Sequence, residues 1–119
     1  MSKTVSWLLE MQVQEGHASD LKTLMAEMSS GTQANEPGTL MYEWSLSADG
    51  TICHLWERYV DSAAALAHGG TFVAKYAGRF LSVLKPVRCV VYGSPNEAVK
   101  QALAPFAPVY MAPAAGFSR

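Results

Sequence analysis

The period of the hydrophobic pattern switches repeatedly along this chain, and the order of the switches restricts the fold more than any other feature. Hydrophobic residues alternate where a strand is expected and recur every three or four residues where a helix is expected. The alternating segments are 5–15, 40–46, 52–60 and 87–92, and the helical segments are 18–34 and 62–84. This β-α-β-β-α-β order predicts a ferredoxin-like α+β fold. Its four-stranded antiparallel sheet would have the order 4-1-3-2, with both helices on one face.

Turn and capping residues mark the ends of these elements. The dipeptides Pro37-Gly38 and Asp49-Gly50 are typical of tight turns, and they bracket the second strand. Asp61 stands where its side chain would accept a hydrogen bond from the first-turn amides of the second helix. The pair Gly69-Gly70 predicts a break or kink in that helix, with a restart near Thr71.

The composition indicates that one face of the sheet needs a partner. Half of the residues are hydrophobic and 16% are charged, whereas about 25% is usual for globular domains. The face opposite the helices is therefore expected to be apolar, and two copies are expected to pack these faces together as a homodimer, which gives a dimeric α/β barrel. His54 and Arg58 fall on that face and are interpreted as interface groups, paired with Glu10 or Glu43 across the dimer.

Charge and composition argue against several classes of function. The net charge is −1 and no basic stripe exists, so no nucleic-acid partner is expected. No apolar run approaches the roughly 20 residues of a membrane span. The N-terminal residues lead into a strand without a signal-peptide core, which predicts a cytoplasmic location. Cys53 and Cys89 fall in strands separated by another strand, so we expect free buried thiols. No histidine cluster or C-x-x-C motif suggests a metal site.

The C-terminal region is expected to extend a single domain of 119 residues, whose core would be residues 5–93. Ser94-Pro95-Asn96-Glu97 combines a cap, an early proline and a glutamate, which predicts a short helix to about Leu103. The rest of 94–119 is too rich in proline and alanine for a helix and too apolar to be free in solvent. We expect it to lie extended against this subunit or its partner.

Two segments resemble the antibiotic biosynthesis monooxygenase (ABM) family. They are E-P-G-T-L-x-Y-E at 36–43 and W-E-R-Y-V-D-S-A-A-A-L-A-H at 56–68, followed by Phe72. The resemblance extends over about residues 5–93 and implies a dimeric α+β barrel. Family members include cofactor-independent oxygenases of quinols and polycyclic phenols, haem-degrading enzymes and proteins that act on small signalling metabolites.

Haem degradation is not expected for this chain. The haem-degrading relatives bind iron through a histidine four residues after the phenylalanine that matches Phe72, and this chain has Tyr76 there. The tryptophan that flexes haem in those relatives corresponds to His68. The resemblance therefore favours a protein that works without a cofactor.

Glu57 and His68 are the candidate catalytic pair. Strand and helix geometry place them at similar depth on either side of Asp61, so that the carboxylate would orient the imidazole and raise its basicity. A structural pair that ties helix to sheet is an equal alternative. The candidate substrate-binding residues are aromatic, with packing in the core as their alternative role; they are Tyr42, Tyr59, Trp7, Trp44, Phe72 and Tyr76.

Three hypotheses for the function follow. The first is a cofactor-independent monooxygenase of a small electron-rich aromatic such as a quinol, with O2 as co-substrate and His68 as the base. In that hypothesis Glu57 orients His68, while Tyr42 and Tyr59 donate hydrogen bonds to the substrate. The second is an isomerase or decarboxylase of a small oxo-acid that uses the same base without oxygen. The third is a dimeric small-ligand-binding protein without catalytic activity.

Overall fold

The computed structural model describes residues 3–119 and has the predicted order of helices and strands. The expectation about an N-terminal signal concerns in part residues 1–2, which lie outside the described residues. The elements, in chain order, are β1 (Val5–Val13), α1 (Ala18–Asn35), β2 (Thr39–Leu46), β3 (Ile52–Tyr59), α2 (Ser62–Lys75), α3 (Ala77–Val83), β4 (Leu84–Gly93), α4 (Glu97–Leu103), a 3-10 turn (Ala104–Phe106) and β5 (Val109–Met111).

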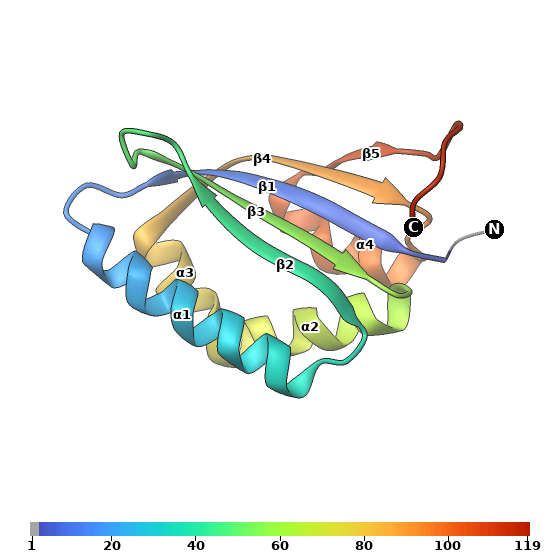
Figure 1. Ribbon diagram of the computed structural model, residues 1–119, viewed down its shortest axis with the longest axis horizontal. Coiled ribbons are helices and arrows are strands. Elements are labelled where there is room, and N and C mark those ends of the chain that lie inside the picture. The colour runs from blue at the N-terminus through green and yellow to red at the C-terminus, as the bar shows by residue number, and fades with distance from the viewer. Residues whose placement is uncertain (1–2) are drawn as a thin grey trace.

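The sheet has the order β2-β3-β1-β4-β5 (Figure 1). Its first four strands pair antiparallel, so the predicted order 4-1-3-2 is confirmed. The short strand β5 pairs parallel to β4 and makes the sheet five-stranded and mixed, whereas four strands were predicted. The C-terminal region was expected to lie extended against this subunit or its partner, and β5 pairs with its own subunit.

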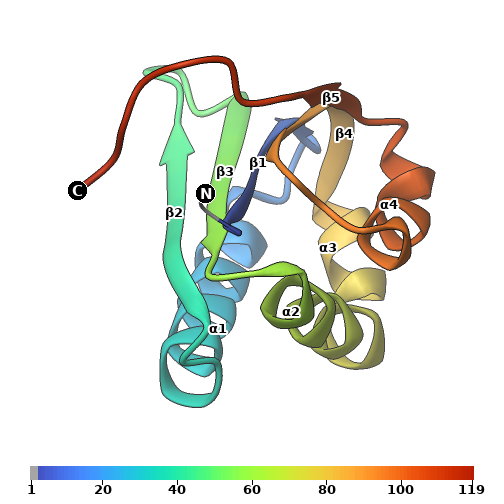
Figure 2. The same ribbon diagram turned by 90° about the vertical axis from the view of Figure 1, so that its right-hand side faces the viewer.

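The helices lie on one face of the sheet, and the core fills the space between them (Figure 2). Alternation along β1 explains this arrangement, because every second side chain from Val5 to Met11 is at most 5% exposed. These side chains pack against apolar residues of the helices; the buried helical residues in this cluster are Leu21, Leu24, Met28, Ala65, Phe80, Val83, Val99 and Leu103.

The second helical region breaks at a different place from the one predicted. Helix α2 continues through Gly69-Gly70 to Lys75, and the break occurs at Tyr76, where φ is −124° and ψ is −23°. A Cβ placed on either glycine would meet nothing within 4 Å, so neither glycine is required by crowding. The weak helix propensity of glycine is overridden here by packing of the helix against the sheet.

Several predicted boundaries also shift. Asn96, rather than Ser94, caps α4 by accepting a hydrogen bond from the Val99 amide at 3.0 Å. Strand β1 ends at Val13, two residues early, and β4 begins at Leu84, three residues early. Leu40 lies at an irregularity in the β2–β3 pairing and is 54% exposed.

The sheet face without helices carries a mixture of apolar and charged side chains. Trp56 is 45% exposed there. His54 lies 3.6 Å from Glu10 of the same chain. The predicted pairing of His54 across a dimer is therefore not required. The segment after β5 crosses this face (Figure 2), and Arg58 donates a hydrogen bond to the Ser118 hydroxyl at 2.9 Å.

The two cysteines are free and buried, as predicted. Strand β1 separates them, since Met11 pairs with Cys53 and Leu9 with Cys89. Burial raises the pKa of Cys53 to about 11 and, with the charge of Glu57, that of Cys89 to about 12. Within residues 3–119, no helix has the length and apolar character to cross a membrane, and no cluster of three or more acidic, histidine or cysteine side chains is arranged to hold a metal.

Candidate active site

His68 lies in the core between two carboxylates. Asp61 begins α2 by accepting a hydrogen bond from the Ala64 amide at 2.9 Å, and this start places His68 on the helix face toward the sheet. His68 Nδ1 is 2.8 Å from Glu36 Oε1, and His68 Nε2 is 3.2 Å from Glu57 Oε1. The residue is 6% exposed. The structure therefore brings Glu57 and His68 together and adds Glu36 to them.

Glu57 is held by donors from two strands. Trp7, its partner in the β1–β3 register, donates from Nε1 to Oε2 at 2.7 Å. Tyr59 donates its hydroxyl to Oε1 at 2.5 Å. Together with His68 these groups satisfy both carboxylate oxygens of a residue that is only 2% exposed. These donors meet the hydrogen-bonding needs of a buried carboxyl group.

Glu36 comes from the turn between α1 and β2. Its Oε1 also accepts a hydrogen bond from the Thr39 hydroxyl at 3.1 Å. The turn lies close to α2, because a Cβ on Gly38 would be 2.6 Å from the Cβ of Ala64. The Val60 amide donates to the Gly38 carbonyl at 2.9 Å and ties the turn to the end of β3. Glu36 was not among the predicted site residues, although it begins the first segment that resembles the family.

The protonation of His68 follows from these contacts. A neutral imidazole has one N–H, so only the imidazolium donates to both carboxylates. Burial by itself lowers the pKa of His68, but the hydrogen bonds and charges of Glu57 and Glu36 outweigh burial and raise the pKa above its ordinary 6.5. In that form the group of Glu36, His68 and Glu57, called here the carboxylate–imidazole array, carries a net charge of −1.

Two buried hydrogen-bond donors near the array have no acceptor among residues 3–119. They are the hydroxyl of Tyr42 and Nε1 of Trp44, and both are shielded from solvent. The Tyr42 ring centroid lies 5.3 Å from that of His68 and 6.1 Å from that of Trp44. Burial, followed by the charges of Glu57 and Glu36, raises the pKa of Tyr42 far above its ordinary value, so the phenol stays protonated. Unmet buried donors cost about 1–3 kcal/mol each.

A hollow of about 480 Å³ lies along the seam between α1 and the edge strand β2. It is lined by Met25, Ala26, Ser29, Tyr42, Trp44 and Leu46. His68 is not among its lining residues, but Tyr42 both lines the hollow and packs against the His68 ring. Tyr42 therefore separates the hollow from the array.

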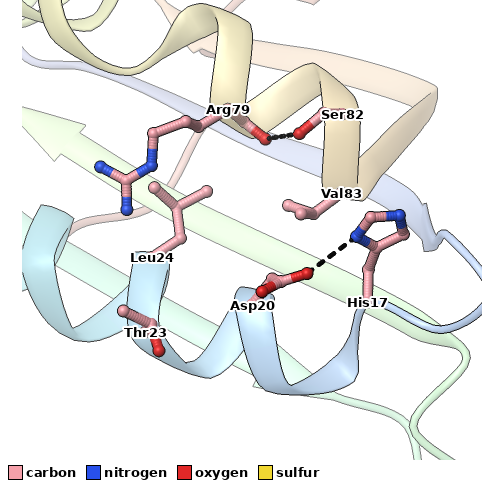
Figure 3. Close-up of a pocket in the computed structure, with 7 residues that line it drawn as sticks. All are labelled: His17, Asp20, Thr23, Leu24, Arg79, Ser82 and Val83. Carbon is pink, nitrogen blue, oxygen red and sulfur yellow. Dashed lines mark hydrogen bonds and ion pairs between the residues drawn. The ribbon is translucent and has the colours of Figure 1, made fainter.

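A second hollow, of about 260 Å³, lies between α1 and α3 (Figure 3). His17 pairs there with Asp20 at 3.0 Å, and their side chains are 40% and 68% exposed. Arg79 pairs with Glu27 at 2.6 Å. These groups are solvated surface pairs, and they are less suited to chemistry than the buried array.

The predicted aromatic residues separate into two groups. Trp7 and Tyr59 contact Glu57, and Tyr42 and Trp44 line the larger hollow. Phe72 instead packs edge-on against Phe80, with ring centroids 5.0 Å apart. The Tyr76 hydroxyl points toward Gly31 of α1, where it would be 3.1 Å from an added Cβ.

This fold belongs to a known class of small α+β proteins. The model of the antibiotic biosynthesis monooxygenase family matches residues 4–76, which is more than half of the chain. The chain therefore belongs to the antibiotic biosynthesis monooxygenase family, as the sequence resemblance predicted, and its general function is monooxygenase-like.

Solved structures extend the comparison. MupZ from Pseudomonas fluorescens is 26% identical with a TM-score of 0.81, and the match covers 99% of this chain and 96% of that one. Rv0793 from Mycobacterium tuberculosis is 28% identical with a TM-score of 0.66, and the match covers 80% of this chain and 98% of that one. A Caulobacter crescentus protein, described as a candidate antibiotic biosynthesis monooxygenase, is 24% identical with a TM-score of 0.63. That match covers 76% of this chain and 86% of the other. The search of curated proteins found no match.

Proposed function

We propose that this protein is a cofactor-independent monooxygenase of a small electron-rich aromatic such as a quinol. The observation that carries the proposal is the buried imidazole of His68 between Glu36 and Glu57, next to the unpaired donors of Tyr42 and Trp44. Such a reaction needs a base, hydrogen-bond donors for the substrate oxygen and an aromatic lining. Membership of the family supports the general class.

The first step of the reaction is removal of a proton from a substrate hydroxyl. The neutral form of His68 accepts this proton at Nε2. The charge of Glu57, 3.2 Å from that nitrogen, stabilises the imidazolium that forms. The substrate oxygen becomes a phenolate, and the unpaired donors of Tyr42 and Trp44 supply hydrogen bonds to it.

The second step is electron transfer from the electron-rich phenolate to O2. The reduced oxygen then bonds to a ring carbon, the O–O bond breaks, and one oxygen atom leaves as water. The balance for a quinol is quinol plus O2 to hydroxyquinone plus water, so the substrate supplies every electron. An apolar setting protects the intermediates from solvent, and Phe72 and Phe80 supply apolar rings near Trp44.

Access to His68 passes Tyr42 in this proposal. The substrate stacks in the hollow against the rings of Tyr42 and Trp44, and Met25 lies at the same hollow with a flexible side chain. Movement of the Tyr42 ring then opens the way to the imidazole. Tyr59 continues to donate its hydroxyl to Glu57 and so keeps that carboxylate in position.

We also propose that the protein acts as a homodimer. Members of the family usually form dimers, and the sheet face without helices exposes Trp56 to 45%. The C-terminal segment crosses this face but leaves Trp56 exposed, and a second copy packed there would cover such residues. The cytoplasmic location stays a prediction from the sequence.

The test is turnover of a panel of quinols by metal-free protein under O2, with ¹⁸O2 labelling of the product. We expect one ¹⁸O atom per product and loss of turnover in the absence of oxygen. His68→Asn should reduce kcat by about 10²-fold or more, whereas the exposed surface variant Glu27→Gln should keep full activity. Turnover that continues without oxygen would instead favour an isomerase or decarboxylase, and full activity in His68→Asn would contradict the role of the base.

A further inference from the structure

The two carboxylates that contact His68 are not equivalent. Glu36 lies 2.8 Å from Nδ1, and Glu57 lies 3.2 Å from Nε2. If His68 has lost one proton, the remaining N–H can serve only one of them. The neutral imidazole is the form that acts as a base in the proposed function, on which this inference rests. Its tautomer decides which nitrogen has the free lone pair that can take the substrate proton.

Glu57 depends little on His68. Trp7 donates to one of its oxygens at 2.7 Å and Tyr59 to the other at 2.5 Å. When His68 Nε2 gives up its proton, Glu57 still has a donor on each oxygen. Its buried charge is therefore stabilised without the imidazole.

Glu36 depends more on His68. Its described side-chain donors are His68 at 2.8 Å and the Thr39 hydroxyl at 3.1 Å, and both reach the same oxygen, Oε1. The Glu36 side chain is only 11% exposed, so loss of the imidazole N–H would leave one weak donor on a largely buried charge. The remaining proton of neutral His68 therefore stabilises the site more on Nδ1, where it is donated to Glu36, than on Nε2, where it is donated to Glu57.

The turn holds Glu36 rigidly enough for this role. Gly38 packs on Ala64 of α2, and its carbonyl accepts from the Val60 amide at the end of β3. The Thr39 amide donates to the Glu36 carbonyl at 3.0 Å. The backbone of the turn that carries Glu36 is thus tied to both the strand and the helix of the site.

The other groups that face His68 do not change charge in the working range of pH. The rings of Tyr42 from β2 and Tyr59 from β3 lie 5.3 and 5.4 Å from the His68 ring. Burial and the charge of Glu57 raise the pKa of both phenols well above the ordinary value, so both stay neutral. Tyr76, near Tyr42, stands at the end of α2. The carboxylates of Glu36 and Glu57 are the charged groups that control the imidazole.

We propose that Glu36 is the positioning residue of the site: it holds the Nδ1–H tautomer of neutral His68 and so leaves Nε2 as the nitrogen that takes the substrate proton. Glu57 then serves as the fixed negative charge beside Nε2. The pair Glu36–His68 resembles in its logic the carboxylate that orients a catalytic histidine. Glu57 was the orienting residue expected from the sequence, and this inference assigns that role to Glu36.

The experiment measures the His68 tautomer by ¹⁵N NMR of the imidazole above its pKa, in the substrate-free protein. We expect the Nδ1–H tautomer in the wild-type protein and in Glu57→Gln. In Glu36→Gln the charged acceptor is Glu57 alone, so we expect a change to the Nε2–H tautomer. Glu27→Gln, an acid-to-amide change on an exposed part of α1, is the matched control and should resemble wild type.

Kinetics supply the second measurement. Glu36→Gln should lower kcat on the quinol by about 10²-fold with little change in KM, because Tyr42 and Trp44 bind the substrate. The acid limb of its pH profile should move to lower pH. An Nε2–H tautomer in wild type, or an unchanged tautomer in Glu36→Gln, would overturn the inference even if turnover is found. Absence of turnover with the expected tautomers would overturn the proposed oxygenase and leave the positioning of His68 in place.

Discussion

Replacement of Glu57 by glutamine is the sharpest test of how the array contributes to stability. Glutamine keeps the shape of the side chain but has one oxygen and no charge. In the native protein Oε1 accepts from Tyr59 and His68, and Oε2 accepts from Trp7. If the amide oxygen of glutamine occupies the position of Oε1, its NH2 group occupies the position of Oε2. This NH2 group then faces the Trp7 N–H, so that two donors face each other.

The magnitude can be worked from these contacts. An unsatisfied buried donor costs about 1–3 kcal/mol, and removal of one member of a buried ion pair costs about 3–5 kcal/mol. The two costs overlap because they concern one side chain, and His68 keeps Glu36 as a second counter-charge at 2.8 Å. We therefore expect Glu57→Gln to lose about 3 kcal/mol, near the lower end of that range. Domains of this kind have a total stability of about 5–15 kcal/mol.

The assay is urea unfolding at pH 6 and fixed protein concentration, followed by tryptophan fluorescence, since Trp7 is buried. Glu43→Gln is the matched control, because Glu43 is an exposed residue of β2 and such changes usually fall within about 0.5 kcal/mol. If Glu57→Gln unfolds within about 1 kcal/mol of wild type, the array is not the buried charged network described here.

Two further predictions concern pH and packing. Because the pKa of His68 is raised in the folded protein, its contribution to stability is complete below about pH 6.5. This contribution is lost as the pH rises through the pKa of His68 in the folded protein. The urea midpoint of the wild-type protein should therefore decrease above neutral pH, and that of His68→Gln should decrease less. A Gly38→Ala variant should lose about 1–3 kcal/mol, because its Cβ would lie 2.6 Å from that of Ala64. Gly69→Ala, where the added Cβ meets nothing within 4 Å, should instead gain about 0.5–1 kcal/mol; equal thermal shifts in the two glycine variants would contradict the packing of the turn on α2.

The sheet and the contact between Glu57 and His68 were predictable because they depend on periodicity. Alternation along a strand fixes which side chains share a face, and Glu57 and Tyr59, two residues apart on β3, are both buried. The cap at Asp61 fixes where α2 begins, and the spacing to His68 then sets its depth. Local rules were sufficient for this part of the site.

Glu36 was missed because periodicity gives no information in a turn. Its contact with His68 joins residues 32 positions apart, and it depends on how closely Gly38 packs on Ala64. Strand β5 was missed for a related reason, since its three residues are all exposed and show no alternation. The helix break was misplaced because glycine propensity is a weak local preference that packing overrides.

The array and the unpaired donors together argue for a chemical role. A structural pair that ties helix to sheet would account for His68 and Glu57, but it requires neither the second carboxylate of Glu36 nor the unsatisfied donors of Tyr42 and Trp44. Buried charges are poor stabilisers, because well-packed apolar side chains of similar volume are often as stable or more so. Here two separate costs, a buried net charge and unmet donors, fall between the same helices and strands, whereas the adjoining core is apolar. Departures from consistent packing that gather in one place are typical of functional sites, and an electron-rich substrate with an acidic hydroxyl would satisfy the donors and use the base at once.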